Sequence, residues 1–472
     1  MTWEAVIGLE IHVHLKTRTK MFCRCAVGAL DEPNTRTCPV CLAHPGTLPV
    51  PNRRAIEMTL LLGLALDCEI AEHAVFHRKN YFYPDNPKGY QISQYDQPLC
   101  RNGRLALPSP DGASVVGITR AHLEEDAAKT LHVGGAEGRI HGATASDVDF
   151  NRGGTPLVEI VTEPDIRTAE QARRFLQLLR QTVVELGISD AEMEKGSLRF
   201  DVNVSVRPEG SDELRTRTEL KNMNSFAFAA RGIEREIQRQ IAIYEQGGEV
   251  EQETLHFDPG HENAPPLRSK EEAQDYRYFP EPDLVPVEPL REWSLDELRA
   301  RLPESPATRL ARLFATGIDA RDAEALSSEP ARAALFEAVR DAGIDAGPAA
   351  AFVLNDVARH EVDPARVNGA ELAKVLRDRD QIPRESLDAA IAASADADFS
   401  AERYLRQRTV ADASELDPVI DRILTENEGQ VQAYRNGKEG LLGFFVGQVM
   451  RETEGKANPK VVNERLREKL NA

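Results

Sequence analysis

Two stretches of the chain alternate apolar and polar residues with a period of two. The polar positions are Gly8, Glu10, His12 and His14 in residues 7–15, and Arg199, Asp201, Asn203 and Ser205 in residues 198–206. A period of two sends alternate side chains to opposite faces of a β-strand, so each stretch predicts a half-buried strand. The alternative is an ordinary solvated face, which tends to carry Thr rather than Asp and Asn. The pattern therefore favours a sheet that carries reactive groups on one face.

Length, composition and charge limit the class of protein. A chain of 472 residues with 41% hydrophobic residues can form two to four domains of about 100–200 residues each. The longest apolar run, residues 60–66, is far shorter than the ~20 residues of a membrane span, and residues 1–4 show no basic segment leading an apolar one. We therefore expect a cytoplasmic protein with no membrane partner. A net charge of -19 argues against a surface that binds nucleic acid throughout, although a local basic patch can still dock RNA.

Four of the six cysteines form two close pairs. Cys23 and Cys25 are separated by one residue, and Cys38 and Cys41 by two. Four thiolates from two such pairs suit tetrahedral zinc, and a site filled by four protein ligands is structural. A disulfide framework is the alternative, but thiols stay reduced inside cells. The pattern predicts a loop, residues 23–41, that is held by a structural Zn²⁺.

Acidic and basic residues gather in further short blocks. Glu124, Glu125 and Asp126 are consecutive, and they repel one another unless a cation or basic group sits among them. The alternative is an exposed acidic turn. Arg152 lies beside a Gly-Gly turn that can present N–H groups to an anion, and a short strand with Glu159 follows it. No P-loop or dinucleotide-binding glycine motif occurs, so an ATP site would be built from carboxylate-held Mg²⁺ and basic side chains on a sheet.

The composition changes beyond Pro280. Four prolines between residues 280 and 289 predict a stiff linker, and Ala, Leu, Arg and Glu with helical spacing dominate after it. We expect an α+β protein with a catalytic domain over residues 1–290, an all-α domain over 291–405 and a small helical tail over 406–472. Residues 431–472 hold eight Lys or Arg against five Glu, a net +3 that suits contact with RNA, and the alternative is the ordinary basic face of a small helical bundle.

Several blocks resemble, in order and spacing, the B subunits of the tRNA-dependent Asp/Glu amidotransferases. They are GLEIHV at 8–13, KNYFYPD at 79–85, HLEED at 122–126, ELKN at 219–222, DYRYFPEPD at 275–283, YRNGK at 434–438 and GKANP at 455–459. The resemblance covers essentially the whole chain and is densest over residues 1–290. It implies an antiparallel sheet cradle similar to the catalytic fold of glutamine synthetase, and a tail that resembles the YqeY domain.

The resemblance also implies an activity. The family transfers the γ-phosphate of ATP to the side-chain carboxylate of Glu or Asp misacylated on tRNA(Gln) or tRNA(Asn), and ammonia then displaces phosphate. A carboxylate becomes a good electrophile only when its oxygen turns into a phosphate leaving group, and this step depends on Mg²⁺ and cations. The chain shows no Ser/Lys amidase signature, so ammonia is expected to come through a polar tunnel from the amidase, which is the A subunit of the family's complex. The small C subunit would complete the heterotrimer.

Site residues follow from the same resemblance. Glu10, Glu125 and Glu159 are expected to hold Mg²⁺, with His12 and Glu124 beside them. Further acidic and basic groups are expected to position the substrates: Glu219, Lys79, Arg152, Arg199 and Lys221. The basic groups would neutralise phosphate oxygens.

Two other classes of protein account for part of the pattern. A non-catalytic, zinc-stapled RNA-binding scaffold explains the cysteines and the basic tail, but not the acids and histidines on strand faces. A metal-dependent hydrolase explains the acids, but gives no reason for the Asn, Lys and Arg blocks. The scaffold predicts no Mg·ATP site, and the hydrolase predicts activity without ATP.

Overall fold

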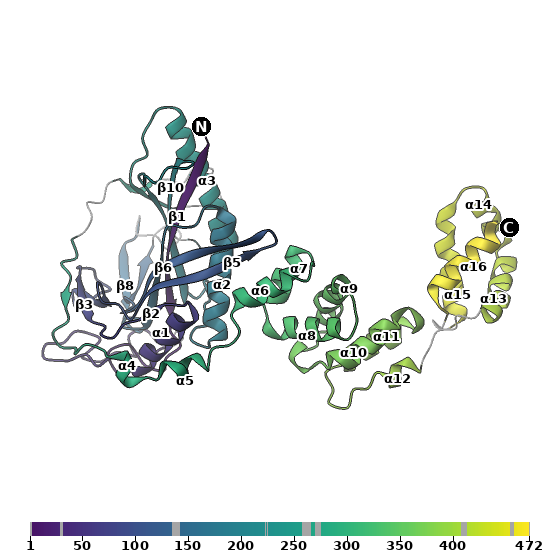
Figure 1. Cartoon of the computed structure of the whole chain (residues 1–472), viewed down its shortest axis with the longest axis horizontal. Helices are drawn as coiled ribbons and strands as arrows, with labels where there is room; N and C mark the ends of the chain where they lie inside the picture. Colours follow the sequence, from purple (N-terminus) through teal and green to yellow (C-terminus); the bar gives the residue numbers. More distant parts are fainter. Residues whose placement is uncertain are drawn as a thin grey trace. The chain divides into compact units, whose positions relative to one another are not determined.

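The computed structural model divides the chain into two compact units, Met1–Thr308 and Arg309–Ala472. It describes residues 2–28, 32–134, 142–221, 223, 225–256, 266–269, 275–406, 413–453 and 457–471. Asn222 of the ELKN block and Gly455 and Lys456 of the GKANP block lie outside these ranges. The α+β class is confirmed, since a large sheet fills the first unit and helices make up the second (Figure 1).

A nine-stranded sheet forms the centre of the first unit. Its strands lie in the order β13 (Pro266–Ser269), β12 (Glu253–His256), β11 (Thr218–Lys221), β10 (Leu198–Pro208), β1 (Trp3–His14), β9 (Pro156–Thr162), β6 (Gly112–Glu125), β5 (Cys100–Ser109) and β2 (Glu69–Ile70). All neighbours are antiparallel except β11 and β12. The two alternating stretches of the sequence, now β1 and β10, lie side by side at its centre.

Helices cover the apolar face of this sheet. On β1 the side chains of Ile7, Leu9, Ile11 and Val13 are buried, as the alternation predicts. α2 (Ala169–Glu185) and α3 (Phe226–Glu245) contact each other along the sheet, and α1 (Arg53–Ala65) contacts β5, β6 and β9 (Figure 1). Apolar side chains of both partners fill this layer, so the polar face of β1 and β10 points away from the helices.

Two small sheets complete the strand content. β14 (Phe279–Pro280), β3 (Phe76–Asn80) and β4 (Tyr90–Gln94) form one, and β7 (Lys129–Val133) pairs with β8 (Ala145–Asp149) in the other. β4 contacts β6, and Ser93 donates a hydrogen bond to the carboxylate of Glu124 over 3.1 Å. The Leu123 N–H of β6 also donates to Gln94 on β4, so the three-stranded sheet lies beside the end of β6.

A buried ion pair joins two distant blocks within the three-stranded sheet. Arg78 on β3 donates two hydrogen bonds to Glu281, of 2.7 and 2.8 Å, and its guanidinium lies 4.2 Å from the ring centroid of Tyr90. The Glu281 side chain is 0% exposed. A bidentate pair of this kind fixes both position and orientation. It fastens the 275–283 block beside β3.

We expect Arg78→Ala to destabilise the protein by about 2 kcal/mol, because it leaves the buried Glu281 carboxylate without its charged donors. The matched control is Arg277→Ala, whose pair with Asp275 is exposed and is expected to contribute about 0–1 kcal/mol. Thermal or urea unfolding of both variants measures the difference. Equal losses would show that the buried pair does not anchor the block.

The last part of the first unit consists of short helices. α4 (Pro289–Glu292) and α5 (Leu295–Arg299) follow the proline-rich stretch, and α5 contacts α1. Arg301 pairs with Glu57 over 2.6 Å, and the Arg53 guanidinium lies 4.5 Å from the Trp293 ring. These contacts extend the first unit to Thr308, past the change of composition that suggested a boundary at residue 290.

The second unit is helical. Its helices are α7 (Ala320–Ser327), α8 (Pro330–Asp341), α9 (Ala346–Ala351), α10 (Gly369–Arg377), α11 (Arg384–Ala393), α12 (Glu402–Leu405), α13 (Ala413–Glu426), α14 (Glu428–Arg435), α15 (Leu442–Glu452) and α16 (Pro459–Asn471), and α6 (Pro306–Phe314) spans the boundary. α13, α15 and α16 share one apolar core that includes Ile420, Phe445 and Leu466. Among the described residues, no helix has the length and apolar content needed to cross a membrane.

Candidate functional site

Strand register brings the reactive groups of the large sheet into one row. His12 on β1 lies opposite Arg199 on β10 and opposite Glu159 on β9. Glu10 lies opposite Asp201, and His122 on β6 lies opposite Glu159. Directly opposed residues of antiparallel strands point to the same face. Four neighbouring strands therefore contribute to one polar surface.

Five of these side chains form a cluster, which we call the acid–histidine cluster: Glu10, His12, His122, Glu124 and Glu159. Glu159 lies at its centre, 3.4 Å from His12 Nε2 and 3.7 Å from His122 Nε2. Glu124 approaches both imidazoles to 3.8 Å, and Glu10 lies 3.7 Å from His12. The structure thus unites four of the predicted site residues, and it adds His122.

The cluster carries two sets of ligand atoms suited to a metal ion. The atoms of Glu10, His12 and Glu159 all lie within 4.8 Å of one another, and so do those of His122, Glu124 and Glu159. Carboxylate oxygens are the ligands that Mg²⁺ prefers, and it binds through one or two carboxylates while retaining water and substrate phosphates. The carboxylates of the two sets suit a Mg²⁺ ion that keeps water in the rest of its shell.

Electrostatics in the cluster reflect crowding of negative charge. Burial alone would lower the pKa of His12, but the hydrogen bond with Glu159 and the charges of Glu124, Glu159 and Glu10 raise it to about 9. Burial and the neighbouring Glu159 raise the pKa of Glu10. Burial opposes ionisation of Glu159 too, but His122 and His12 keep its pKa below the ordinary value. The carboxylates of Glu10, Glu124 and Glu159 therefore crowd around the two imidazoles, and Arg120, whose Nη2 lies 3.4 Å from Glu159, adds a further positive charge.

Lys79 reaches the same cluster from the three-stranded sheet. Its Nζ lies 4.8 Å from the ring centroid of Tyr276. Burial would lower the pKa of Lys79, but Glu124, Tyr278 and Glu159 raise it. Lys79 therefore stays charged and faces the acids from the side of β6 and β9.

Two further predicted cations lie on the other side of β1. Lys221 on β11 lies 3.4 Å from Asp201 and 3.3 Å from Glu219. Burial alone would lower the pKa of Lys221, but these two acids raise it above the ordinary value. Glu219 also accepts a hydrogen bond from Thr254 over 3.0 Å. Arg199 projects from β10, and its Nη2 lies 3.0 Å from Asp126. Strands β10 and β11 therefore add two cations to the polar face, each paired with acidic side chains.

Asp126 is the centre of a second cluster, which we call the Asp126 cluster: Asp126, His14, Arg152 and Arg199. His14 Nε2 lies 2.7 Å and Arg152 Nε lies 3.5 Å from the carboxylate. Burial would raise the pKa of Asp126, but the hydrogen bond with His14 and the charges of Arg199 and Arg152 lower it well below its usual range. Sequence reasoning did not assign a role to Asp126 or His14, although the run of three acids indicated that a basic group sits among them.

The Arg152 guanidinium donates two hydrogen bonds to backbone carbonyl groups. Its Nε donates to the carbonyl of Ala127 over 2.9 Å and its Nη2 to that of Ala128 over 2.7 Å. These bonds hold the turn after Asp126 against the glycine turn. A role in binding phosphate remains a prediction for this residue.

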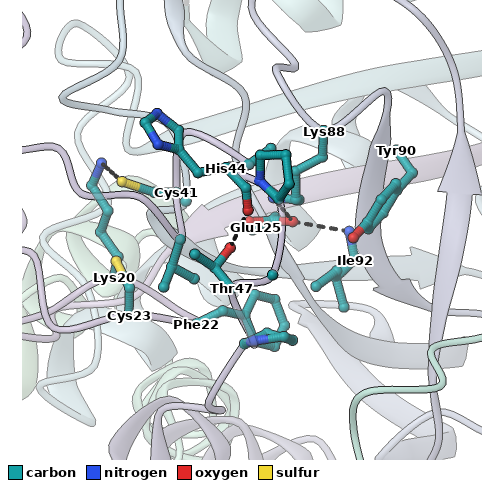
Figure 2. Close-up of a pocket in the computed structure, with 16 residues that line it drawn as sticks. Lys20, Phe22, Cys23, Cys41, His44, Thr47, Lys88, Tyr90, Ile92 and Glu125 are labelled. Atoms are coloured by element: carbon teal, nitrogen blue, oxygen red, sulfur yellow. Dashed lines mark hydrogen bonds and ion pairs between the residues drawn. The ribbon is translucent and has the colours of Figure 1, made fainter.

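Glu125 lies apart from the acid–histidine cluster, contrary to the expected magnesium set. Its carboxylate accepts a hydrogen bond from the Ile92 N–H over 3.0 Å and pairs with Lys88 over 2.6 Å (Figure 2). The pocket there, of about 240 Å³, is also lined by Cys23 and Cys41. Consecutive residues of β6 point to opposite sides, so Glu124 reaches His12 and Glu125 cannot. Glu124 therefore lies with Glu10 and Glu159 in the acid–histidine cluster, and a role of Glu125 in holding Mg²⁺ stays a prediction.

The four predicted zinc ligands come together. The Sγ atoms of Cys23, Cys25, Cys38 and Cys41 all lie within 4.8 Å of one another. The Cys38 N–H donates to Cys41 Sγ over 3.2 Å, and Lys20 Nζ lies 3.7 Å from the same sulfur (Figure 2). Both donors favour a thiolate, the form that binds metal. The cluster can hold a structural metal ion, and four soft sulfur ligands suit Zn²⁺.

We expect Cys38→Ser to lose the bound zinc and to lower the melting temperature, because a three-sulfur site no longer closes the loop. Metal analysis of the purified protein measures the zinc content. The control is Cys68→Ala, which removes a buried thiol outside the cluster and should keep one zinc per chain. Unchanged zinc content in Cys38→Ser would refute the four-cysteine site.

Comparison with known proteins covers nearly the whole chain. Residues 5–294 match the model of the GatB/GatE catalytic domain, and residues 334–470 match that of the GatB domain. The B subunit of the aspartyl/glutamyl-tRNA(Asn/Gln) amidotransferase from Geobacter sulfurreducens is 46% identical over 486 residues, which is 100% of both chains. The protein of the same name from Syntrophotalea carbinolica is 46% identical over 482 residues, which cover 99% of this chain and 98% of the relative. The one from Geotalea daltonii is 47% identical over 488 residues, which cover 100% of both chains. The resemblance drawn from the sequence motifs is confirmed, and the chain belongs to the family of aspartyl/glutamyl-tRNA(Asn/Gln) amidotransferase B subunits.

Proposed function

We propose that this chain activates the side-chain carboxylate of Glu or Asp misacylated on tRNA(Gln) or tRNA(Asn) with ATP, and that it then amidates the activated group. The acid–histidine cluster on the sheet carries this proposal. The γ-phosphoryl group passes from ATP to a carboxylate oxygen, which gives ADP and an acyl phosphate. Ammonia then attacks the acyl carbon and releases inorganic phosphate, leaving Gln-tRNA(Gln) or Asn-tRNA(Asn).

The residues of the polar face suit this chemistry. Glu159 would hold Mg²⁺ together with one of the two pairs beside it, Glu10 and His12 or His122 and Glu124. A bound Mg²⁺ neutralises charge on the transferring phosphoryl group. Lys221 and Arg199, on β11 and β10, would attract phosphate oxygens. Lys79, on the opposite side, would hold the acceptor carboxylate beside the cluster.

The same reasoning supports a glutamine synthetase-like cradle, in which antiparallel strands carry acids and cations on one face. The chain lacks a Ser/Lys amidase signature, so ammonia would come from the amidase partner, with the small third protein of the heterotrimer completing the complex. The reaction belongs in the cytoplasm, where tRNA is charged and used.

The proposed contact of the tail with tRNA depends on how many of its basic side chains are not paired with acids of the tail itself. Residues 431–472 carry a net +3, but Arg465 pairs with Asp417 and Lys469 pairs with Asp421 over 2.6 Å. Internal pairs of this kind reduce the field available to a nucleic acid. Other basic residues of the tail, such as Lys460, would carry most of the contact.

The decisive experiment combines this chain with the amidase and the small partner, glutamine, ATP, Mg²⁺ and either Glu-tRNA(Gln) or Asp-tRNA(Asn). We expect the amidated tRNA to form only when ATP is present. Amidated tRNA formed in the absence of ATP would contradict activation by phosphorylation, and release of the free amino acid without ATP would instead indicate a hydrolase. The absence of ATP-dependent product with both tRNAs would contradict the proposal.

A further inference from the structure

A line of aromatic rings leads away from the acid–histidine cluster. Lys79, which faces Glu124 and Glu159, lies under Tyr276 at 4.8 Å. Tyr276 meets Tyr278 edge to face, with ring centroids 6.1 Å apart, and Tyr278 stacks on Tyr95 at 4.3 Å with an interplanar angle of 9°. We call Tyr276, Tyr278 and Tyr95 the aromatic shelf. It joins the reactive cluster to the surface of the three-stranded sheet.

The outer end of the shelf is open to solvent. Tyr95 is 56% exposed, although it stacks on Tyr278 and meets the ring of His77 edge to face at 6.2 Å. Phe279, which follows Tyr278 in the chain, is 43% exposed. These contacts hold the Tyr95 ring in place while leaving much of it available. A fixed, exposed aromatic face is the usual platform for an unpaired nucleobase.

Two adenine bases enter this reaction, one in ATP and one at the 3′ end of the acyl-tRNA. The position of the aromatic shelf indicates which of the two it would contact. In phosphoryl transfer the leaving and attacking oxygens approach the phosphorus from opposite sides. Of the cations suited to ATP phosphates, Lys221 lies on β11, on one side of β1, whereas the Arg199 guanidinium reaches across the sheet to Asp126. The shelf and Lys79 belong to the three-stranded sheet, which stands against β6 on the other side. The shelf is therefore on the side of the acceptor, whose terminal base is separated from the reacting carboxylate only by the aminoacyl ester and the ribose.

We propose that Tyr95 and Tyr278 stack the 3′-terminal adenine of the acyl-tRNA and thereby place its side-chain carboxylate beside Lys79. The proposal rests on the proposed function and names a subsite for part of that substrate. Stacking recognises the unpaired end shared by all tRNAs. It therefore positions the acyl group without selecting between tRNA(Gln) and tRNA(Asn).

The kinetic test uses the complete complex with the variant Tyr95→Ala. We expect the KM for Glu-tRNA(Gln) to rise about tenfold, the range expected for the loss of one base–aromatic stack, with little change in the KM for ATP. Tyr95→Phe keeps the ring and should restore the KM. The matched control is Tyr244→Ala, which removes a ring that stacks on Trp3 at the start of β1. A raised KM for ATP alone would assign the shelf to the adenine of ATP and overturn the proposal, as would unchanged values for both substrates.

A binding test separates this subsite from the activity. The probe is deacylated tRNA(Gln) with 2-aminopurine as its terminal base, whose fluorescence falls when the base stacks, added without ATP. We expect quenching by the wild-type complex and by Tyr95→Phe, and its loss in Tyr95→Ala. No quenching by the wild type would refute the shelf even if the enzyme is active. Quenching that depends on Tyr95 would support it even if no amidated product forms, which would contradict the proposed function alone.

Discussion

Replacing Glu159 by Gln should lower the rate of ATP-dependent amidation by at least about a thousandfold. Glu159 belongs to both sets of candidate metal ligands and contacts His12 and His122. The amide keeps the size of the side chain but removes its charge, so the site binds Mg²⁺ more weakly. It also removes the hydrogen-bonding carboxylate that raises the pKa of His12 to about 9. In the variant we expect that pKa to fall towards its ordinary value.

Two measurements separate loss of the site from loss of the fold. Mg²⁺ titration in the presence of ADP should show weaker binding by Glu159→Gln, and the melting temperature should report any general damage. Glu163→Gln is the matched control, because this acid follows the same strand but is exposed and bonds to Thr119. Full activity in Glu159→Gln, or an equal loss in the control, would place the chemistry elsewhere.

The centre of the large sheet was predictable because its signal is local. The alternation of residues 7–15 and 198–206 requires only neighbouring side chains, and both stretches fold as central strands with their apolar faces buried. The same rule separates Glu124 from Glu125, since the alternating pattern of β6 places His122 and Glu124 on one side. Applied to the run of three acids, it would have selected Glu124 from the sequence alone.

Contacts between distant segments could not be predicted in this way. Lys79 faces Glu124 and Glu159 only because a second sheet folds against the first. The partners of Asp126, such as His14 and Arg199, come from other strands, and no spacing rule relates them to an acid at position 126. The four cysteines are an exception, since zinc ligand spacing is itself a local pattern.

We also expect Asp126→Asn to destabilise the protein by about 1–3 kcal/mol, because it removes a buried carboxylate charge whose arginine partners are partly exposed. Asp126 is 7% exposed and contacts His14, Arg199 and Arg152. Its pKa is lowered in the folded state, because the His14 hydrogen bond and the two arginines outweigh burial. The folded protein therefore binds a proton at this carboxylate less tightly than the unfolded chain. The resulting stability is fully present above the unfolded-state pKa of about 4 and is lost as the pH falls below it.

The difference in stability between wild type and Asp126→Asn should consequently be largest near pH 7 and should shrink towards pH 3, because only the wild type can lose this charge. Thermal unfolding at a series of pH values measures the change. Asp190→Asn is the control, since its pair with Lys16 is exposed on both sides and should contribute about 0–1 kcal/mol at any pH. A constant gap between wild type and Asp126→Asn over this range would show that the carboxylate does not hold the two arginines through its charge. Because Asp126 holds the Arg199 guanidinium, Asp126→Asn should also make Arg199 more mobile. Amidation activity should therefore fall together with stability in this variant.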